Sequence, residues 1–266
     1  MRLHPLAPAH RAPLRDRDAK PPADAPSHEK LKTLIDDETA RIADLQQTFY
    51  ADARFALLIV LQGRDASGKD GTIRSVFSAV NPQGCEVTSF KTPTELEAQH
   101  DFLWRVHQHV PRRGMIGIFN RSHYEDVLVD RVRMKMPKRV YRARYEQINA
   151  FEHMLTENGT IILKFFLHVS RDEQRSRLEA RLADETRNWK FRSEDLEDRA
   201  MWKSYTAAYQ DLLRACGTDW APWYLVPADD KKLRNWLIAR RIADTMDDLG
   251  LRYPEASKAV RQLEIE

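Results

Sequence analysis

Short apolar segments alternate with amphipathic segments along most of this chain. Five of the apolar segments are rich in branched or aromatic side chains, which is typical of strands buried in a sheet. They span residues 55–62, 86–90, 115–119, 160–169 and 222–227. Apolar residues at helical spacing predict a helix over 29–50 and further helices between the strands. The alternation predicts an α/β fold with three layers (α/β/α) around a five-stranded, mostly parallel sheet.

Several helix boundaries carry their own signals. Thr94 and Glu97 have the spacing of a capping box. Ser170 and Ser193 are good N-cap residues for the helices that follow them. The helices expected after the first strand span 70–80, 94–109, 124–133, 140–156, 171–182, 193–215 and 231–249.

The pattern of strands and helices is confined to residues 29–253, which we interpret as one domain. Residues 1–28 are rich in proline and charge, and they predict an irregular arm that is ordered only where it packs on a neighbour. Residues 254–266 form a C-terminal tail without a clear pattern. Because ligands collect at the carboxyl ends of parallel strands, the loops that follow the five strands are expected to converge.

The segment GRDASGKDGT, residues 63–72, follows the most apolar strand and contains the spacing Gly63-x4-Gly68-Lys69. A strand, a glycine turn and a helix in that order predict a phosphate-binding loop. Glycines let backbone N–H groups turn inward, and the helix N-terminus adds unpaired N–H groups with a partial positive charge. Lys69 adds a full positive charge. The alternative is an ordinary glycine-rich turn between a strand and a helix.

Two positions of this segment concern a metal ion. The usual motif has Ser or Thr after the lysine to hold Mg²⁺, whereas this chain has Asp70 there and Thr72 two residues later. Asp65 offers a carboxylate where a metal ion that bridges phosphates would sit. The phosphate- or nucleotide-binding candidates of the segment are Gly63, Arg64, Ala66, Ser67, Gly68, Asp70, Gly71 and Thr72.

The segment after the third strand, FNRSHYEDVLVDRV at 119–132, contains a second set of candidates. Arg121 lies at the strand's end, where it can reach phosphate oxygens, and Glu125 and Asp126 follow on the first helical turn, toward a metal or base site. From residue 121 to 144, Lys and Arg outnumber Asp and Glu, which predicts a positive wall beside the loop. The alternative is a solvated helix face. The remaining candidates here are Asn120, Arg131 and Arg133.

A basic helical segment follows the fourth strand. Its arginines form two i,i+4 pairs, Arg171 with Arg175 and Arg177 with Arg181, which lie about 120° apart around a helix. Together with Lys190 they predict a lid over about residues 171–192 that closes on phosphates. The alternative is a charged helix pair on the surface.

Composition narrows the function. A net charge of only +3 over 266 residues argues against a general nucleic-acid-binding protein. Cys85 and Cys216 are isolated and fit a reducing compartment, so we expect a cytoplasmic protein. No apolar run approaches about 18 residues, so no membrane span is expected.

The segments GRDASGKDGT, NPQG (81–84), FNRSHYEDVLVDRV and SRDEQRSRLEARL (170–182) together resemble the polyphosphate kinase 2 family. The resemblance implies a P-loop kinase fold and phosphate transfer between inorganic polyphosphate and purine nucleotides with Mg²⁺ or Mn²⁺. It also implies that Asp65 binds the metal ion or orients the acceptor, that Lys69 and Arg121 contact phosphate, and that the lid cations hold the polymer. Family members commonly form homodimers or homotetramers.

The form NRSxYED resembles the class III branch, which accepts both AMP and ADP. Other branches have Asp where this chain has Asn120, so the second metal ligand is left open between Glu125 and Asp126. Two alternative functions are an ATP-dependent nucleoside or nucleotide kinase of the same fold and a non-catalytic regulator that binds polyanions or nucleotides. ATP formation from ADP and polyphosphate alone separates the three.

Overall fold

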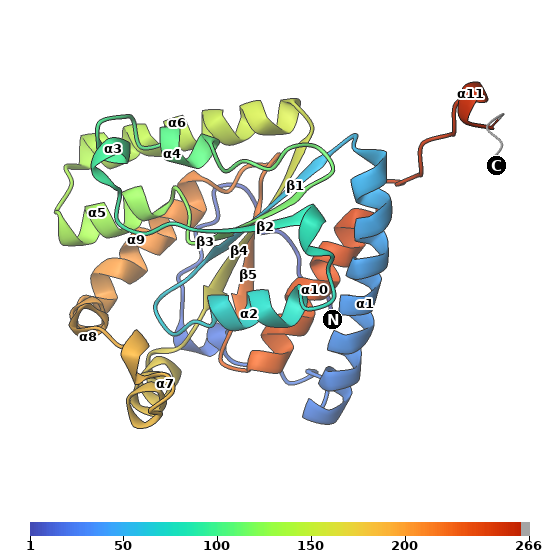
Figure 1. Ribbon diagram of the computed structural model, residues 1–266. Helices are drawn as coiled ribbons and strands as arrows, with labels where there is room; N and C mark the ends of the chain where they lie inside the picture. The colour runs from blue at the N-terminus through green and yellow to red at the C-terminus, as the bar shows by residue number, and fades with distance from the viewer. Residues whose placement is uncertain (262–266) are drawn as a thin grey trace.

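The computed structural model describes residues 1–261, with five parallel strands in one sheet of order β2-β3-β1-β4-β5 (Figure 1). The strands are β1 (Ala56–Gln62), β2 (Cys85–Ser89), β3 (Ile116–Asn120), β4 (Thr160–His168) and β5 (Trp223–Pro227). Every residue of β1 is buried, and this central strand pairs with both β3 and β4. The predicted strands are confirmed with small shifts of their ends, and the sheet is parallel throughout.

Helices cover both faces of the sheet because side chains of β1 point alternately to each. Leu57 and Ile59 pack against helices α1 (His28–Asp52), α2 (Lys69–Val76) and α10 (Lys231–Asp247). Leu58 and Val60 belong to the core on the opposite face. The helices of that face are α4 (Trp104–His107), α5 (Glu125–Arg133), α6 (Lys138–Glu157) and α9 (Trp202–Ala215). The three-layer α/β/α prediction is confirmed.

The predicted lid segment forms a helical projection at one end of the sheet, and Figure 1 shows its helices α7 and α8 at the lower left of the molecule. It consists of α7 (Arg171–Ala183), the 3₁₀ helix η3 (Asn188–Lys190) and α8 (Ser193–Ala200). The remaining short elements are η1 (Asp16–Ala19), η2 (Pro82–Gly84), α3 (Glu95–Ala98) and α11 (Lys258–Arg261).

Two long helices expected from the sequence are each broken in two. The predicted capping box of Thr94 and Glu97 is present, but it starts only the short helix α3. The Asp101 carboxylate accepts a hydrogen bond from the Leu103 backbone N–H at 3.0 Å, which forms a new turn before α4. One helix therefore ends at residue 98, and a second helix begins at residue 104.

The helix expected over 193–215 is interrupted at Met201, between α8 and α9. Its N-cap is Arg192, not Ser193. Helix α9 buries an apolar face that includes Tyr205 and Leu212, whereas α8 buries only Asp195. The two halves therefore face different surroundings, which one straight helix could not do.

The N-terminal arm packs on its own sheet. The Leu6 N–H donates to the Trp223 carbonyl in β5 at 2.8 Å, and the Asp229 N–H donates to the Ala19 carbonyl at 3.0 Å. Within residues 1–27, η1 is the only helix or strand, in line with the irregular arm predicted for residues 1–28. Residue 28 is the first residue of α1. In the predicted tail, α11 is described, whereas residues 262–266 lie outside the described residues. None of the helices within residues 1–261 combines the length and hydropathy that a membrane crossing requires.

Candidate active site

The loop between β1 and α2, residues 63–68, lies at the carboxyl end of the central strand. Gly68 has φ +104°, a backbone conformation that side chains with a Cβ rarely adopt, and a Cβ there would collide with the Arg234 guanidinium. The first N–H groups of α2 have no partner within the helix, so they are available to an anion. The loop therefore has a left-handed glycine next to a helix N-terminus, as the predicted phosphate-binding loop requires.

Two arginines hold this loop from the side of α7 and α10, which we call its back. Arg177 of α7 donates to the carbonyls of Ala66 at 2.9 Å and Ser67 at 3.1 Å, and Arg234 of α10 donates to the Ser67 carbonyl at 3.0 Å. Arg177 also donates to the carbonyls of Ala228 and Asp229 at 2.6 and 2.8 Å. These bonds tie the loop to the lid helix and to the segment before α10.

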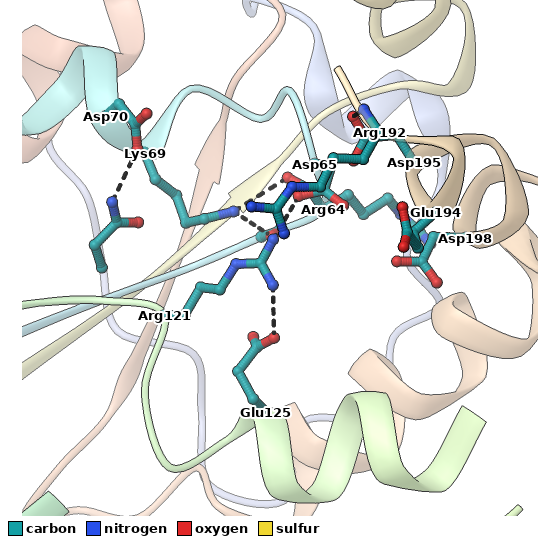
Figure 2. A network of polar contacts seen from close by, with 12 residues as sticks. Arg64, Asp65, Lys69, Asp70, Arg121, Glu125, Arg192, Glu194, Asp195 and Asp198 are labelled. Atoms are coloured by element: carbon teal, nitrogen blue, oxygen red, sulfur yellow. Dashed lines mark hydrogen bonds and ion pairs between the residues drawn. The ribbon is translucent and has the colours of Figure 1, made fainter. Parts of the chain in front are cut away.

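The side of the loop next to Arg121, which we call its front, carries Lys69 and Asp65 (Figure 2). The buried Lys69 ammonium donates to the Gly63 carbonyl at 2.7 Å, and burial together with the charge of Arg121 lowers its pKa. Asp65 accepts a hydrogen bond from Arg121 at 2.7 Å. Burial raises the pKa of Asp65, but the charges of Arg121 and Lys69 outweigh it and lower the pKa below its ordinary value. Asp65 is therefore held as a carboxylate.

Arg121 connects the loop to helix α5. It leaves the end of β3 with φ +62° and donates to both Asp65 and Glu125, the latter at 3.3 Å. Glu125 also accepts a hydrogen bond from Gln62, the last residue of β1, at 3.1 Å. Asp65, Arg121 and Glu125 therefore form one chain of polar contacts across the ends of two neighbouring strands (Figure 2).

A fully buried polar network supports the turn that carries Arg121. The Tyr124 hydroxyl donates to the Glu152 carboxylate at 2.7 Å, and His123 lies 3.1 Å from the same carboxylate. The Lys164 ammonium donates to Glu152 at 2.6 Å and to the Tyr124 hydroxyl at 2.9 Å. Because the buried charges are paired and hydrogen-bonded, this network can fix the backbone in the left-handed conformation at Arg121.

Two further candidates of the loop have side-chain partners on other elements. Asp70 accepts from the Asn120 amide at 2.8 Å and lies 3.5 Å from the Lys190 ammonium of the lid. The buried Thr72 hydroxyl donates to Asn235 of α10 at 3.2 Å, so its side chain faces the back of the loop. The candidates in the loop itself are Gly63, Arg64, Ala66, Ser67 and Gly68, and Gly71 lies in the first turn of α2.

The two arginine pairs of α7 face different ways, as their spacing predicts. Arg177 reaches the loop, and Arg181 pairs with Asp195 of α8 at 3.4 Å. Arg171 and Arg175 are exposed, and Arg175 pairs with Glu179 at 2.7 Å. Of these four arginines, Arg177 is therefore the one that hydrogen-bonds the phosphate loop.

Three candidates of this segment have ion-pair partners on other helices, and their predicted contact with phosphate or metal stays a prediction. Arg131 pairs with Asp211 of α9 at 2.8 Å, and Arg133 pairs with Asp198 of α8 at 2.8 Å, so both connect helices. Asp126 lies 3.4 Å from Arg105, and burial raises its pKa to about 6. Glu125 and Asp126 are one residue apart on α5, and only Glu125 lines the pocket that contains Asp65.

The carboxylates at this pocket fit a magnesium ion. Mg²⁺ is commonly held by one or two carboxylates together with phosphate oxygens, and Asp65 and Glu125 both contact Arg121 at the pocket. Within residues 1–261, no group of three or more His, Cys, Asp or Glu side chains is arranged to hold a metal ion by itself. A phosphate-bearing substrate would therefore complete the ligand set.

Sequence reasoning missed several residues of the site. Arg234 lies among other charged residues in KKLRNWLIAR, residues 231–240, so no sequence signal marks it. Gln62 is a polar residue at the end of an otherwise apolar strand, and that contrast was its available signal. The other missed residues at the pocket are Leu128, Val129, Gln174, Asp198, Trp202, Tyr205 and Tyr209. Most of them come from α9 and the lid, whose approach to the loop depends on tertiary packing.

A parallel α/β/α sheet, a glycine loop with a buried lysine, and an arginine from the next strand define a P-loop kinase. A family model described as polyphosphate kinase 2 (PPK2) matches residues 26–252. The chain belongs to this polyphosphate kinase 2 family.

Individual relatives agree with this assignment. The chain is 51% identical over 226 residues to an AMP/ADP-polyphosphate phosphotransferase of Meiothermus ruber, covering 85% of each chain. It is 46% identical over 247 residues to an ADP-polyphosphate phosphotransferase of Rhodopseudomonas palustris, covering 88% of this chain and 84% of the relative. The crystal structure of polyphosphate kinase 2 from Arthrobacter aurescens superimposes with a TM-score of 0.86 at 39% identity, over 92% of this chain and 86% of the other.

Proposed function

We propose that this protein is a polyphosphate-dependent nucleotide kinase that transfers phosphate between inorganic polyphosphate and AMP or ADP, with GMP and GDP as further substrates to test. The observation that carries the proposal is the convergence of Lys69, Arg121 and Asp65 at the front of the phosphate loop. The names of the two relatives support the choice of polyphosphate as the phosphate donor.

The residues of the loop can do what phosphoryl transfer requires. The reaction needs in-line alignment and positive charge where negative charge develops, with little covalent chemistry from the protein. Lys69 exchanges the Gly63 carbonyl for a phosphate oxygen, and Arg121 exchanges its carboxylate partners in the same way. Both cations then contact the transferred group in place of their present partners.

We propose Mg²⁺ as the metal ion, with Mn²⁺ as a substitute, held by Asp65 and Glu125. When bound, the ion would neutralise negative charge on the phosphates. Lid closure is the matching contribution of α7 and α8. Gln174 and Arg177 of α7 already donate to loop carbonyls, and Lys190 reaches Asp70 in the first turn of α2, so the lid can exclude water from the transferred phosphate.

The decisive experiment measures ATP formation from ADP and polyphosphate with Mg²⁺ and no other phosphate donor. AMP, GMP and GDP are assayed in parallel. We expect turnover that is lost in Lys69→Ala and retained in Lys32→Ala, a matched change at an exposed lysine of α1. Turnover with ATP as the donor and none with polyphosphate would instead indicate an ATP-dependent kinase. Binding without any turnover would indicate a regulator.

The proposal extends to the surroundings of the enzyme. Cys85 and Cys216 are both free thiols, which supports a reducing, cytoplasmic location. We also propose a homodimer or homotetramer, in line with the family resemblance, and light scattering of the purified protein measures it directly.

A further inference from the structure

Two cavities meet at Arg64 and Trp202. The first is the front pocket beside Asp65 and Arg121, with a volume of about 30 Å³. The second, which we call the arm pocket, lies between the N-terminal arm and α9 and has a volume of about 300 Å³. Arg64 and Trp202 line both cavities. The front pocket holds little more than water, so a nucleoside cannot enter it in this conformation.

Arg64 separates the two cavities in an unusual way for a buried cation. Its guanidinium lies 3.8 Å from the centre of the Trp202 ring and donates to the Thr206 hydroxyl at 2.6 Å. Within residues 1–261 it has no carboxylate at ion-pair distance, and its buried Nε has no hydrogen-bond partner. Burial lowers its pKa to about 10. A buried, unpaired charge is costly, so an incoming phosphate offers Arg64 a better partner than the indole does.

Trp202 becomes a platform when Arg64 leaves it. Its indole is partly exposed at the first turn of α9, and the face that Arg64 covers is a flat aromatic surface. Guanidinium groups and nucleobases both stack on such faces.

The wall of the arm pocket suits a purine. His168 Nε2 lies 2.9 Å from the Arg15 carbonyl, which can only accept, so Nε2 carries the hydrogen. Burial lowers the pKa of His168, so the ring is neutral and its buried, unpartnered Nδ1 is an acceptor. Asp16 adds a carboxylate to the same wall. Two acceptors beside an aromatic face can accept hydrogen bonds from the exocyclic amino group of a purine.

We propose that nucleotide binding exchanges the partners of Arg64. The phosphate of the nucleotide takes Arg64 away from Trp202, and the purine stacks on the freed indole with its edge toward His168 and Asp16. This inference rests on the proposed nucleotide kinase function and assigns its base-binding residue. It makes Trp202 a binding residue for the nucleotide and leaves polyphosphate without a contact there.

The first test measures affinity and kinetics. We expect Trp202→Ala to raise both the Kd for AMP and the KM for AMP about tenfold, the scale of losing one stacked base. The KM for polyphosphate should stay within about twofold. Trp202→Phe should retain most of the affinity, because it keeps an aromatic face. Ribose 5-phosphate, which has no base, should bind wild type and Trp202→Ala equally.

The second test follows tryptophan fluorescence without polyphosphate, so it needs no turnover. AMP should quench the wild type, and Trp202→Phe should remove most of that change. Trp220→Phe, a matched change at a partly exposed tryptophan that contacts His153, should leave the quenching intact. Thermal unfolding of each variant confirms that it is folded, and Trp202→Phe serves if Trp202→Ala is not.

The outcomes separate the two proposals. Full quenching in Trp202→Phe, or an equal loss of AMP and ribose 5-phosphate binding in Trp202→Ala, would overturn the exchange and leave the kinase function standing. AMP binding that depends on Trp202 without ATP formation from polyphosphate would overturn only the kinase function. A wild type that binds neither AMP nor ADP would overturn both.

Discussion

Four arginines surround the phosphate loop, and those behind it differ from those in front of it. Arg177 and Arg234 donate to backbone carbonyls of the loop, which do not leave when a ligand arrives. Arg64 and Arg121 have side-chain partners, an indole for one and two carboxylates for the other. Side chains can turn away and let a phosphate replace them. We infer that the type of hydrogen-bond or stacking partner, more than burial, distinguishes an arginine that supports the fold from one that is free to bind a substrate.

The sharpest test of the front side is removal of its charges. Lys69→Ala and Asp65→Asn should each lower turnover by at least ~100-fold, the scale for losing a charge contact to the transition state. Neither side chain supports the sheet, so the unfolding temperature should change little. Steady-state assays with polyphosphate and ADP measure the effect, and near-normal turnover in either variant would contradict the assignment.

The back side should respond in stability. Arg177→Met removes a charged donor from two loop carbonyls and from the carbonyls of Ala228 and Asp229, and we expect a loss of about 3 kcal/mol in the free energy of unfolding. For a chain of this size that corresponds to a decrease of roughly 6–12 °C in the unfolding midpoint. Differential scanning calorimetry measures this change.

Arg121→Met is the matched control for the front side. It should lower turnover at least ~10-fold while its unfolding midpoint stays within about 2 °C of wild type, because its carboxylate partners are at the edge of a pocket. The comparison between front and back would break if Arg177→Met kept its stability and lost turnover as Arg121→Met does.

The smallest effect is expected from salt. Polyphosphate carries many charges and should contact the cations of the loop and lid together, whereas a mononucleotide contacts few. Raising the ionic strength should therefore increase the KM for polyphosphate several-fold more than the KM for AMP. Parallel titrations with NaCl measure both constants, and equal salt dependence would argue against a polymer held by lid and loop.

The sequence predicted the strands, the parallel sheet and the loop because these depend on local patterns. The buried run before Gly63 and the glycine spacing are visible without any tertiary information. The sequence did not show which of Glu125 and Asp126 faces the pocket, because neighbouring residues on a helix point about 100° apart and the direction is set by packing. It also assigned Arg131 and Arg133 to phosphate, whereas partners far along the chain pair with both.

Arg234 and Trp202 are residues of the site that the sequence did not reveal. Each lies more than a hundred residues after the loop it contacts, and no local motif marks it. Contacts of this kind arise from the order of strands in the sheet, which brings α9 and α10 to the end of β1. They become visible only in the fold.

The path of the first twenty residues has a practical consequence for work with this enzyme. Hydrogen bonds join Leu6 to β5 and Ala19 to the segment before α10, and Arg15 fixes the tautomer of His168. A shortened version that starts at the first long helix would look like a sensible trimming of a proline-rich leader. It would remove one wall of the arm pocket next to Trp202. A purification tag is therefore better added in front of residues 1–27 than put in their place.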